Sequence, residues 1–440
     1  MARADSNLLE AYSRYRGKIE ALVKVPVKNL QDFSLWYTPG AATPSMAIFN
    51  DKPKAYEYTG KGNSVAIISN GTRVLGLGKI GPDAGLPVME GKALIFKILG
   101  DVDAFPLCIK AEDVPSFVAV ARALEPSFGG VNLEDIESPS CFEINEKLIE
   151  SMEIPVFHDD QHGTSVVVLA GILNALKVVG KKLSRSKIVV MGGGAAGYAV
   201  SKLLIKAGAD SRKLLVGDSC GVIHPGRKDL NRWKRELSTI TNTSSFSGSI
   251  QAALDGADAL IAVSKPGPGI VSPEMVETMA CDPIVFACAN PIPEIMPNDA
   301  KKAGARIVAT GRSDFSNQVN NSLCFPAVFR GMLDVGARKV NDEMKIAAAK
   351  SIATVAEERG IDEEHVLPPM DDCELYPREA AAIGEAAIRT NVARLKVRPD
   401  EIYEVTKARL QRYQKILHFI DRHGLYPVIY PSVQKNGRNK

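Results

Sequence analysis

Two pairs of adjacent acidic residues have the type and placement of metal ligands. Glu134 and Asp135 lie in NLEDIESP, and Asp159 and Asp160 lie in PVFHDDQHGT, preceded by the apolar residues 154–157. Acids at the end of a buried strand are costly to desolvate unless a positive charge binds them. Carboxylate oxygens are hard ligands that favour Mg²⁺ or Mn²⁺ over Zn²⁺. The pattern indicates a divalent-cation site, with a solvated acidic surface as the ordinary alternative.

Two histidines flank the second acidic pair. His158 and His162 are four positions apart, which would place both imidazoles on one face of a helix. Such a pair could hold Zn²⁺ together with the aspartates, but the HExxH pattern of helical zinc sites is absent. We therefore favour a structural or supporting role for both histidines over direct metal binding.

A lysine and a tyrosine are candidates for proton transfer. Lys92 follows Gly91 in PVMEGKALIFK, at the expected start of a helix, where the helix N-terminus and a nearby metal ion would lower the pKa of a lysine. Tyr37 lies in LWYTPG, where the turn expected at Pro39-Gly40 would present its phenol. A solvated lysine and a tyrosine packed in the core are the ordinary alternatives.

The segment GGGAAG has the GxGxxG spacing of a dinucleotide-binding turn. It follows an apolar strand expected at residues 187–191 and opens an expected helix, and Asp218 ends the next expected strand. The glycines would let the backbone approach a pyrophosphate at a helix N-terminus, and Asp218 would accept hydrogen bonds from the adenosine ribose. The residues expected to contact the coenzyme are Gly192, Gly194, Ala195, Ala196, Gly197 and Asp218.

Length and composition bound the class of protein. The chain has 440 residues, of which 45% are hydrophobic and 24% charged, as in globular proteins of two or three domains. The net charge is only +3 and only residues 227–235, expected to be a solvated loop or helix face, are locally basic, so we expect no nucleic-acid binding. No apolar run could span a bilayer, and the N-terminus does not resemble a signal peptide. Seven cysteines without a CxxC pair fit a reducing compartment, and the cytoplasm is the expected location.

The elements around the candidate residues follow from apolar spacing and turn residues. Residues 64–69 and 74–76 are expected to be strands on either side of a turn at Asn70-Gly71, as in a β-hairpin. Helical spacing predicts helices over residues 91–99 and 165–179.

Strands and helices alternate from residue 187, which predicts a parallel sheet of the Rossmann type. After about residue 326 the pattern is helical, with apolar stripes at residues 342–358 and 377–395. The predicted fold class is α/β. Its expected domains are residues 1–162 with the acidic cluster, 163–330 with the dinucleotide turn, and 331–440 as a helical region packing on both.

Taken together, the motifs resemble the malic enzyme family in its small-subunit, prokaryotic-type branch. The matching segments run in the family's order over roughly residues 37–350, and several are long. They include LWYTPG, SNGTRVLGLGKIGP, GLPVMEGKALIFK, NLEDI, IPVFHDDQHGTSVVVLAGILNALKVVGK, GVIHPGR, FACANPIPEIMP and TGRSDFSNQVNNSLCFPAVFRGMLDVGARKVNDEMK.

The resemblance implies a role for each candidate residue. Lys92 would be the general base, Tyr37 the general acid, and Arg73 a ligand of a substrate carboxylate. The resemblance implies an N-terminal domain like that of amino-acid dehydrogenases, followed by the dinucleotide-binding domain, with the site in the cleft between them. Implied metal ligands are Glu134, Asp135 and Asp160, with Asp159 beside them, and implied substrate or nicotinamide contacts are Asn290, Asn320 and Asn321.

The implied reaction is oxidative decarboxylation of malate to pyruvate and CO2, with NAD or NADP and with Mg²⁺ or Mn²⁺, by a homodimer or larger homo-oligomer. One alternative is a related NAD(P)-linked decarboxylating dehydrogenase acting on another 2-hydroxy acid. Another is a catalytically silent regulator that senses nucleotides. Lys79, Lys265 and Cys220 depart from the family's usual residues, and Lys79 and Lys265 leave the exact hydroxy acid open.

The preferred coenzyme depends on the surroundings of Asp218. A fixed acid there bonds the ribose 2′-hydroxyl and repels a 2′-phosphate, and the following Ser219-Cys220-Gly221 supplies no cation. Arg227 and Lys228 follow in the same loop and could reach a 2′-phosphate. We favour NAD, because the carboxylate is nearer in sequence than these cations.

Overall fold

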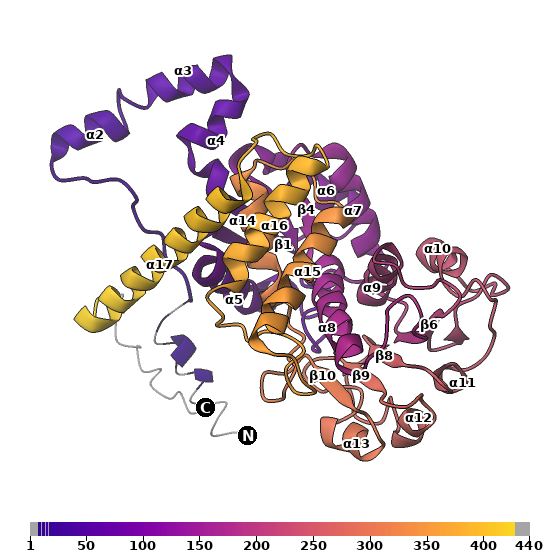
Figure 1. Cartoon of the computed structure of the whole chain (residues 1–440). Helices are drawn as coiled ribbons and strands as arrows, with labels where there is room; N and C mark the ends of the chain where they lie inside the picture. Colours follow the sequence, from indigo (N-terminus) through magenta and orange to yellow (C-terminus); the bar gives the residue numbers. More distant parts are fainter. Residues whose placement is uncertain (1–7, 10, 14, 16, 427–440) are drawn as a thin grey trace, which may run out of the picture.

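The computed structural model describes residues 8, 9, 11–13, 15 and 17–426, which are organised around two β-sheets (Figure 1). The first sheet has four parallel strands in the order β2-β1-β3-β4. Helices α5 (Pro82–Gly100), α6 (Val114–Ala123) and α7 (Ser140–Ser151) connect these strands in turn. The strands are β1 (Ser64–Ser69), β2 (Asp103–Cys108), β3 (Gly130–Leu133) and β4 (Val156–His158).

The hairpin expected around Asn70-Gly71 is wrong. β1 pairs in parallel with β2 on one side and with β3 on the other, and all six of its residues are buried. Val74 forms only an isolated bridge to Gly78. The apolar run of β1 is that of a central parallel strand covered on both faces, which requires crossover connections instead of a tight turn.

Helix α5 is longer than expected, because it begins at Pro82 and not near Gly91. Proline is favoured in the first turn of a helix, where its missing N–H has no intrahelical partner to lose. Pro87 and the glycines of the first half weaken the helical pattern in the sequence. Lys92 therefore lies in the middle of the helix, away from its N-terminus.

The second sheet has six strands in the order β10-β9-β8-β5-β6-β7, parallel except for the β6–β7 pair. The strand order reverses at β5, whose neighbours are β6 and β8, and the glycine turn follows β5 at this switch point. The alternating pattern expected from residue 187 onward is confirmed. The strands are β5 (Ile188–Met191), β6 (Leu214–Asp218), β7 (Gly221–Val222), β8 (Ala259–Ala262), β9 (Ile284–Ala287) and β10 (Ile307–Thr310).

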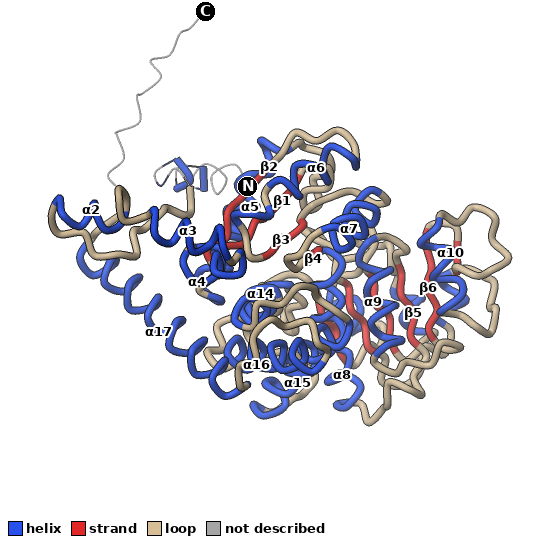
Figure 2. Tube along the Cα trace, turned by 90° about the horizontal axis from the view of Figure 1, so that it is seen from above, coloured by secondary structure: helices blue, strands red, loops and turns tan. Residues whose placement is uncertain are grey.

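One segment joins the two sheets. The π-helical turn η4 (Asp159–Gly163) follows β4 directly and leads into α8 (Thr164–Val178), which is buried along most of its length. Helix α9 (Ala195–Lys206), which follows the glycine turn, packs against both η4 and α8. The acidic cluster and the dinucleotide turn are thus held by elements in direct contact. Figure 2 shows α8 and α9 side by side between the two sheets.

The C-terminal part of the chain is helical, as expected. Helix α15 (Asp342–Arg359) packs against α8, and α16 (Leu375–Arg389) packs against α14 (Phe325–Asp334) and α15. The long helix α17 (Pro399–His423) packs against α16 and α5, and its far end projects from the body (Figure 1). No helix among the described residues is long and apolar enough to cross a membrane.

Apart from the N-terminal helices before α4, the other described helices are short. They are α4 (Ala55–Tyr58), α10 (Arg232–Ile240), α11 (Ile250–Leu254), α12 (Pro273–Glu277), α13 (Pro297–Lys302) and the 3₁₀ turns η1 (Lys52–Lys54), η2 (Gly60–Asn63), η3 (Glu125–Ser127) and η5 (Asn321–Leu323).

Helices α2 (Leu30–Trp36) and α3 (Ala42–Asn50) form an arm that stands away from the body on the same side as α17 (Figures 1 and 2). Neither helix buries any residue. Helices this short are not stable in water without packing. The exposed apolar side chains of the arm include Leu30, Phe33, Leu35, Trp36, Met46 and Phe49.

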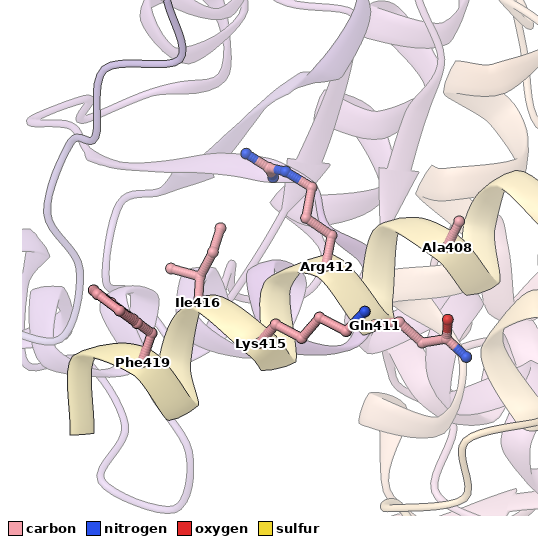
Figure 3. A pocket seen from close by; sticks show the side chains of 6 residues that line it. All are labelled: Ala408, Gln411, Arg412, Lys415, Ile416 and Phe419. Atoms are coloured by element: carbon pink, nitrogen blue, oxygen red, sulfur yellow. The ribbon is translucent and has the colours of Figure 1, made fainter. Parts of the chain in front are cut away.

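A groove of about 530 Å³ follows the exposed face of α17 (Figure 3). Its six lining residues, from Ala408 to Phe419, all belong to this one helix. The acidic cluster and the glycine turn contribute nothing to it, so this groove is separate from the candidate reaction site.

Candidate active site

The acidic cluster forms where two neighbouring parallel strands end. Glu134 and Asp135 directly follow β3, and Asp160 lies in η4, directly after β4. One oxygen atom of each of these three carboxylates lies within 4.8 Å of the others. The structure therefore brings together the three metal ligands predicted from the sequence.

The electrostatics of the cluster fit a divalent cation. Burial, and then the charge of Asp160, raise the pKa of Asp135 to about 7. Burial also raises the pKa of Glu134 well above its ordinary value. The Oδ2 atom of Asp135 is buried without a hydrogen-bond partner. Several carboxylates this close repel one another unless a positive charge lies between them, and their hard oxygens suit Mg²⁺ or Mn²⁺.

Lys92 is the cation that the chain itself places against the cluster. Its Nζ atom lies 2.6 Å from Oε2 of Glu134, is also bonded to Asp159, and lies 4.3 Å from the ring centroid of Phe325. Burial acts to lower the pKa of Lys92, but Asp159 and Glu134 outweigh it, so the pKa is raised. The lowering expected from a helix N-terminus is wrong, since Lys92 lies in mid-helix.

Asp159 has surroundings different from those of the other three acids. Its Oδ2 atom accepts hydrogen bonds from Lys92 and from Nδ2 of Asn321, the latter at 3.0 Å. A side chain at Gly163 would place its Cβ only 2.0 Å from Oδ1 of Asp159, so the tight π-turn requires glycine there. Oδ1 of Asp159, like Oδ2 of Asp135, is buried without a hydrogen-bond partner, but Oδ2 of Asp159 is held by Lys92 and Asn321.

The two histidines support the turn. Nδ1 of His162 accepts a 3.1 Å hydrogen bond from the backbone N–H of His158, and Nδ1 of His158 lies 3.7 Å from Oδ2 of Asp160. Burial lowers the pKa of both histidines, which favours neutral rings. This geometry fits the supporting role expected from the sequence.

Arg73 and Asn290 lie where the two sheets face each other. The backbone N–H of Arg73 donates a 3.0 Å hydrogen bond to the carbonyl of Asp135, and a Cβ at Gly194 would lie 3.9 Å from its Nη1 atom. A Cβ at Gly76 would lie 2.7 Å from the carbonyl oxygen of Asn290. The loop that carries Arg73 thus spans the space between the acidic cluster and the dinucleotide turn.

The two adjacent asparagines have different surroundings. The side-chain amide of Asn321 donates hydrogen bonds to Oδ2 of Asp159 and to Oγ1 of Thr164. The side-chain oxygen of Asn320 accepts a 2.9 Å hydrogen bond from the N–H of Ser322 and so caps η5. The structure brings Asn321 to the cluster and gives Asn320 a structural contact.

The glycine turn has the form needed for a pyrophosphate. Gly192 has φ of +128°, and a Cβ at Gly197 would lie 1.6 Å from the carbonyl oxygen of Gly192, so both positions exclude side chains. Gly194 precedes Ala195, the first residue of α9, without a side-chain cap. The first N–H groups of this buried helix end are therefore available to an anion.

Asp218, at the end of β6, is surrounded by cations. Nη1 of Arg227 lies 2.8 Å from its Oδ1 atom, and Nζ of Lys234 lies 2.5 Å from its Oδ2 atom. Residues 219–221 supply no cation, as expected, but Arg227 is bonded to Asp218 itself, and the expectation that it is solvated is wrong, because its side chain is only 9% exposed. The sequence pattern does not predict Lys234 at this position; α10 brings it back to the strand end by tertiary packing.

Tyr37 is not beside the cluster within one chain. It caps the C-terminal end of α2 in the projecting arm and is 73% exposed. The other residues predicted to do the chemistry lie between the two sheets. The predicted general acid is therefore separated from the predicted base.

Comparisons with known proteins fit this arrangement. The pattern described as "Malic enzyme, N-terminal domain" matches residues 16–149, and "Malic enzyme, NAD binding domain" matches residues 161–388. The chain belongs to the malic enzyme family. A bifunctional malic/malolactic enzyme of Bacillus subtilis is 50% identical over 393 residues, which cover 89% of this chain and 95% of that protein.

Two further relatives extend this malic enzyme likeness. An NAD-dependent malic enzyme of Geobacillus stearothermophilus is 51% identical over 378 residues, covering 86% of this chain and 78% of that protein. The crystal structure of a malic enzyme from Pyrococcus horikoshii superposes with a TM-score of 0.92 at 47% identity, covering 96% of this chain and 99% of that one. Similar proteins include enzymes named NAD-dependent and enzymes named NADP-dependent. The resemblance and the α/β fold predicted from the sequence are confirmed.

Proposed function

We propose that this protein oxidatively decarboxylates malate to pyruvate and CO2 with reduction of a nicotinamide coenzyme. The observation that carries the proposal is the position of Lys92, bonded to Glu134 and Asp159 beside the three-carboxylate cluster. A buried amine next to a hard-cation site, in a chain that also carries a dinucleotide turn, suits the oxidation of a 2-hydroxy acid.

Each residue has a distinct task in the proposed reaction. Glu134, Asp135 and Asp160 would hold the divalent cation. The coenzyme supplies the hydride acceptor, and the cation supplies the Lewis acid that favours loss of CO2. With the cation bound, Glu134 would be a metal ligand and would raise the pKa of Lys92 less than it does in the metal-free chain. Lys92 would then lose its own proton, and the neutral amine would accept the hydroxyl proton, while Asn321 keeps Asp159 in place beneath it.

The remaining groups bind and complete the reaction. Arg73 binds a carboxylate of malate between the two sheets, and Asn290 contacts the substrate and the coenzyme from the opposite loop. Tyr37 returns a proton to C3 of the enolate.

Turnover of malate by the purified protein tests the proposal. Absorbance of the reduced coenzyme and separate assays of pyruvate and lactate would be followed with Mn²⁺ and with excess chelator. We expect equal amounts of pyruvate and reduced coenzyme, and no turnover in chelator or in Asp160→Asn. Lactate without net coenzyme reduction would indicate the malolactic reaction named for a relative, and no turnover with intact coenzyme binding would favour the silent-regulator alternative.

We propose that the protein uses both NAD and NADP as coenzyme. Its preference for NAD over NADP should be weaker than an unpaired carboxylate at Asp218 would give. Arg227 and Lys234 neutralise the carboxylate, so repulsion of a 2′-phosphate is weakened. Lys234, whose side chain is 26% exposed, can turn toward a 2′-phosphate, whereas Arg227 is also held by Asp229.

We also propose that the protein is a homodimer or larger homo-oligomer in which Tyr37 completes the site of a neighbouring copy. The support is the combination of a predicted acid on a projecting arm with helices that bury nothing and expose six large apolar side chains. Surfaces of this kind mark contacts with another protein.

Mixing two inactive variants tests the shared site. A chain with Tyr37→Phe keeps its own Lys92, and a chain with Lys92→Ala keeps its own Tyr37. In a mixed dimer with exchanged tyrosines, one site has both groups, so we expect activity to return after the two are unfolded and refolded together. No regain in mixed oligomers, verified by differential tagging, would show that each site uses its own tyrosine.

The domain division and location remain proposals. We propose units at residues 1–162, 163–330 and 331–440, with η4 at the first boundary. We place the enzyme in the cytoplasm, supported by seven free cysteine thiols.

A further inference from the structure

A second cavity lies behind the acidic cluster, at the junction of the N-terminal sheet, the dinucleotide-binding part and the C-terminal helices. Its volume is about 170 Å³, and α7, η4, α9 and α15 all contribute to its wall. A water molecule occupies about 30 Å³ in the liquid, so the cavity has room for a small organic molecule. None of the residues assigned to the reaction lines it.

Two buried polar side chains of this wall lack partners. Gln161 is 3% exposed, and its Nε2 atom has no hydrogen-bond partner. Asn145 is 7% exposed, and its Oδ1 atom has none either. Buried polar groups are nearly always paired, so this wall is suited to a polar occupant.

Two lysines and two acids, Glu146 and Asp342, line the cavity. The lysines are Lys202 and Lys345. Nδ1 of His162 accepts a hydrogen bond from the backbone, so the ring hydrogen is on Nε2, which is a donor. The wall therefore offers two ammonium groups and further N–H donors.

The acids nearby are already engaged. Asp342 lies 2.7 Å from Nζ of Lys345, and Glu236 lies 2.8 Å from Nζ of Lys202. Glu146 accepts a 2.9 Å hydrogen bond from Nε1 of Trp233. An ammonium group has three N–H donors, so Lys202 and Lys345 each keep at least one beyond these contacts, and the wall can bind a carboxylate without an unpaired acid opposing it.

We infer that this cavity binds a small carboxylate anion at a site separate from the malate site. Lys202, Lys345 and Nε2 of Gln161 hold the carboxylate, and Oδ1 of Asn145 accepts a hydrogen bond from the rest of the molecule. Anion binding here would affect both the metal site and the coenzyme site. Gln161 follows the predicted metal ligand Asp160 in η4, and Lys202 lies on α9, the helix that starts at the glycine turn. Only this coupling depends on the proposed malate reaction, and the binding itself does not.

Succinate is a suitable probe, because it has two carboxylates and no hydroxyl group to oxidise. Binding of radiolabelled succinate would be measured by equilibrium dialysis on the full chain with NADH and Mn²⁺. We expect the double variant Lys202→Met/Lys345→Met to bind one succinate fewer per chain than wild type. Lys350→Met, an exposed position on the same helix α15, is the matched control and should bind as wild type.

Amide hydrogen exchange gives a second readout. Succinate should slow exchange at the start of α15 in wild type and in Lys350→Met, and not in the double variant. Equal succinate binding by the double variant and the control, or no binding by wild type, would overturn the inference and leave a water-filled cavity. If the double variant fails to fold, Lys345→Gln replaces it with the same expectations. Loss of succinate binding with malate turnover retained separates this result from a failure of the proposed function.

Discussion

The side-chain amide of Asn321 donates a 3.0 Å hydrogen bond to Oδ2 of Asp159, across 162 positions of sequence. Asp159 belongs to the turn that follows the first sheet, and Asn321 to the short turn η5 that precedes α14. The same Asp159 oxygen is bonded to Lys92. One contact therefore connects the second half of the chain to the proposed base.

Asn321→Ala should lower kcat by about 10- to 100-fold, the usual range for a residue that orients a site through another group. The loss leaves Asp159 free to rotate and Lys92 less well placed. Steady-state kinetics with malate would measure it. Ser322→Ala is the control, because its buried Oγ atom has no partner and its removal should leave kcat near wild type. Equal loss in both variants would point to disruption of the whole turn.

Lys92→Ala should lower kcat by about 100-fold or more, as expected for loss of a general base. Coenzyme binding should be retained, because Lys92 does not line the glycine turn. The measurement is kcat together with the Kd for NADH from fluorescence. Lys110→Ala, at a side chain that is 82% exposed, is the matched control. Wild-type turnover by Lys92→Ala would remove Lys92 from the reaction.

The stability of the metal-free protein should fall as pH rises from about 4 to about 7. The pKa of Asp135 is raised from 3.8 to about 7, so over this range the folded chain holds a proton that the unfolded chain has lost. The Tm in excess chelator measures this, and Asp135→Asn should reduce the slope. Because a cation must displace that proton, Mn²⁺ affinity should rise up to about pH 7. An unchanged slope in Asp135→Asn would contradict the assignment.

Gly197→Ala should abolish binding of NADH, since its Cβ would lie 1.6 Å from the carbonyl oxygen of Gly192. NADH fluorescence and Tm would be compared with Gly91→Ala. A Cβ at Gly91 meets nothing closer than Nζ of Lys18 at 3.7 Å, and replacing a helical glycine stabilises by about 1 kcal/mol. NADH binding by a folded Gly197→Ala protein would show that the turn can rearrange.

Lys234→Met should reduce kcat/KM with NADP by about tenfold or more and change the value with NAD much less, as expected for loss of one charged hydrogen bond. Lys228→Met, in the preceding loop, is the control. The ratio of kcat/KM for the two coenzymes is the measurement. Equal losses with both coenzymes would assign Lys234 to the shape of the strand end and not to phosphate recognition.

Much of the site could be predicted because short sequence signals determine it. The glycine turn and the acids after β3 and β4 depend on local spacing and on parallel strands ending at one edge. The hairpin prediction failed because Asn70-Gly71 is a strong local turn signal, whereas pairing of β1 is decided by distant strands. A local turn signal does not indicate which strands pair with the strand before it.

The surroundings of Asp218 and Tyr37 could not be predicted for a different reason. Lys234 reaches Asp218 from another element, and the packing of α10 sets that distance. The motif LWYTPG identified Tyr37 as a candidate acid. Nothing in that motif indicates that the residue lies on an arm projecting from the rest of its own chain. The candidate residues themselves could be predicted from sequence motifs. The groups that each of them contacts depend on tertiary and quaternary structure.

The projecting arm has a consequence for how much protein must be present before any reaction occurs. If the acid of each site belongs to a neighbour, a solitary chain can bind coenzyme and malate without releasing product. Specific activity would then climb with enzyme concentration and level off above the dissociation constant of the assembly. Dilution would act as a switch, so the abundance of the chain would set a threshold for carbon flow.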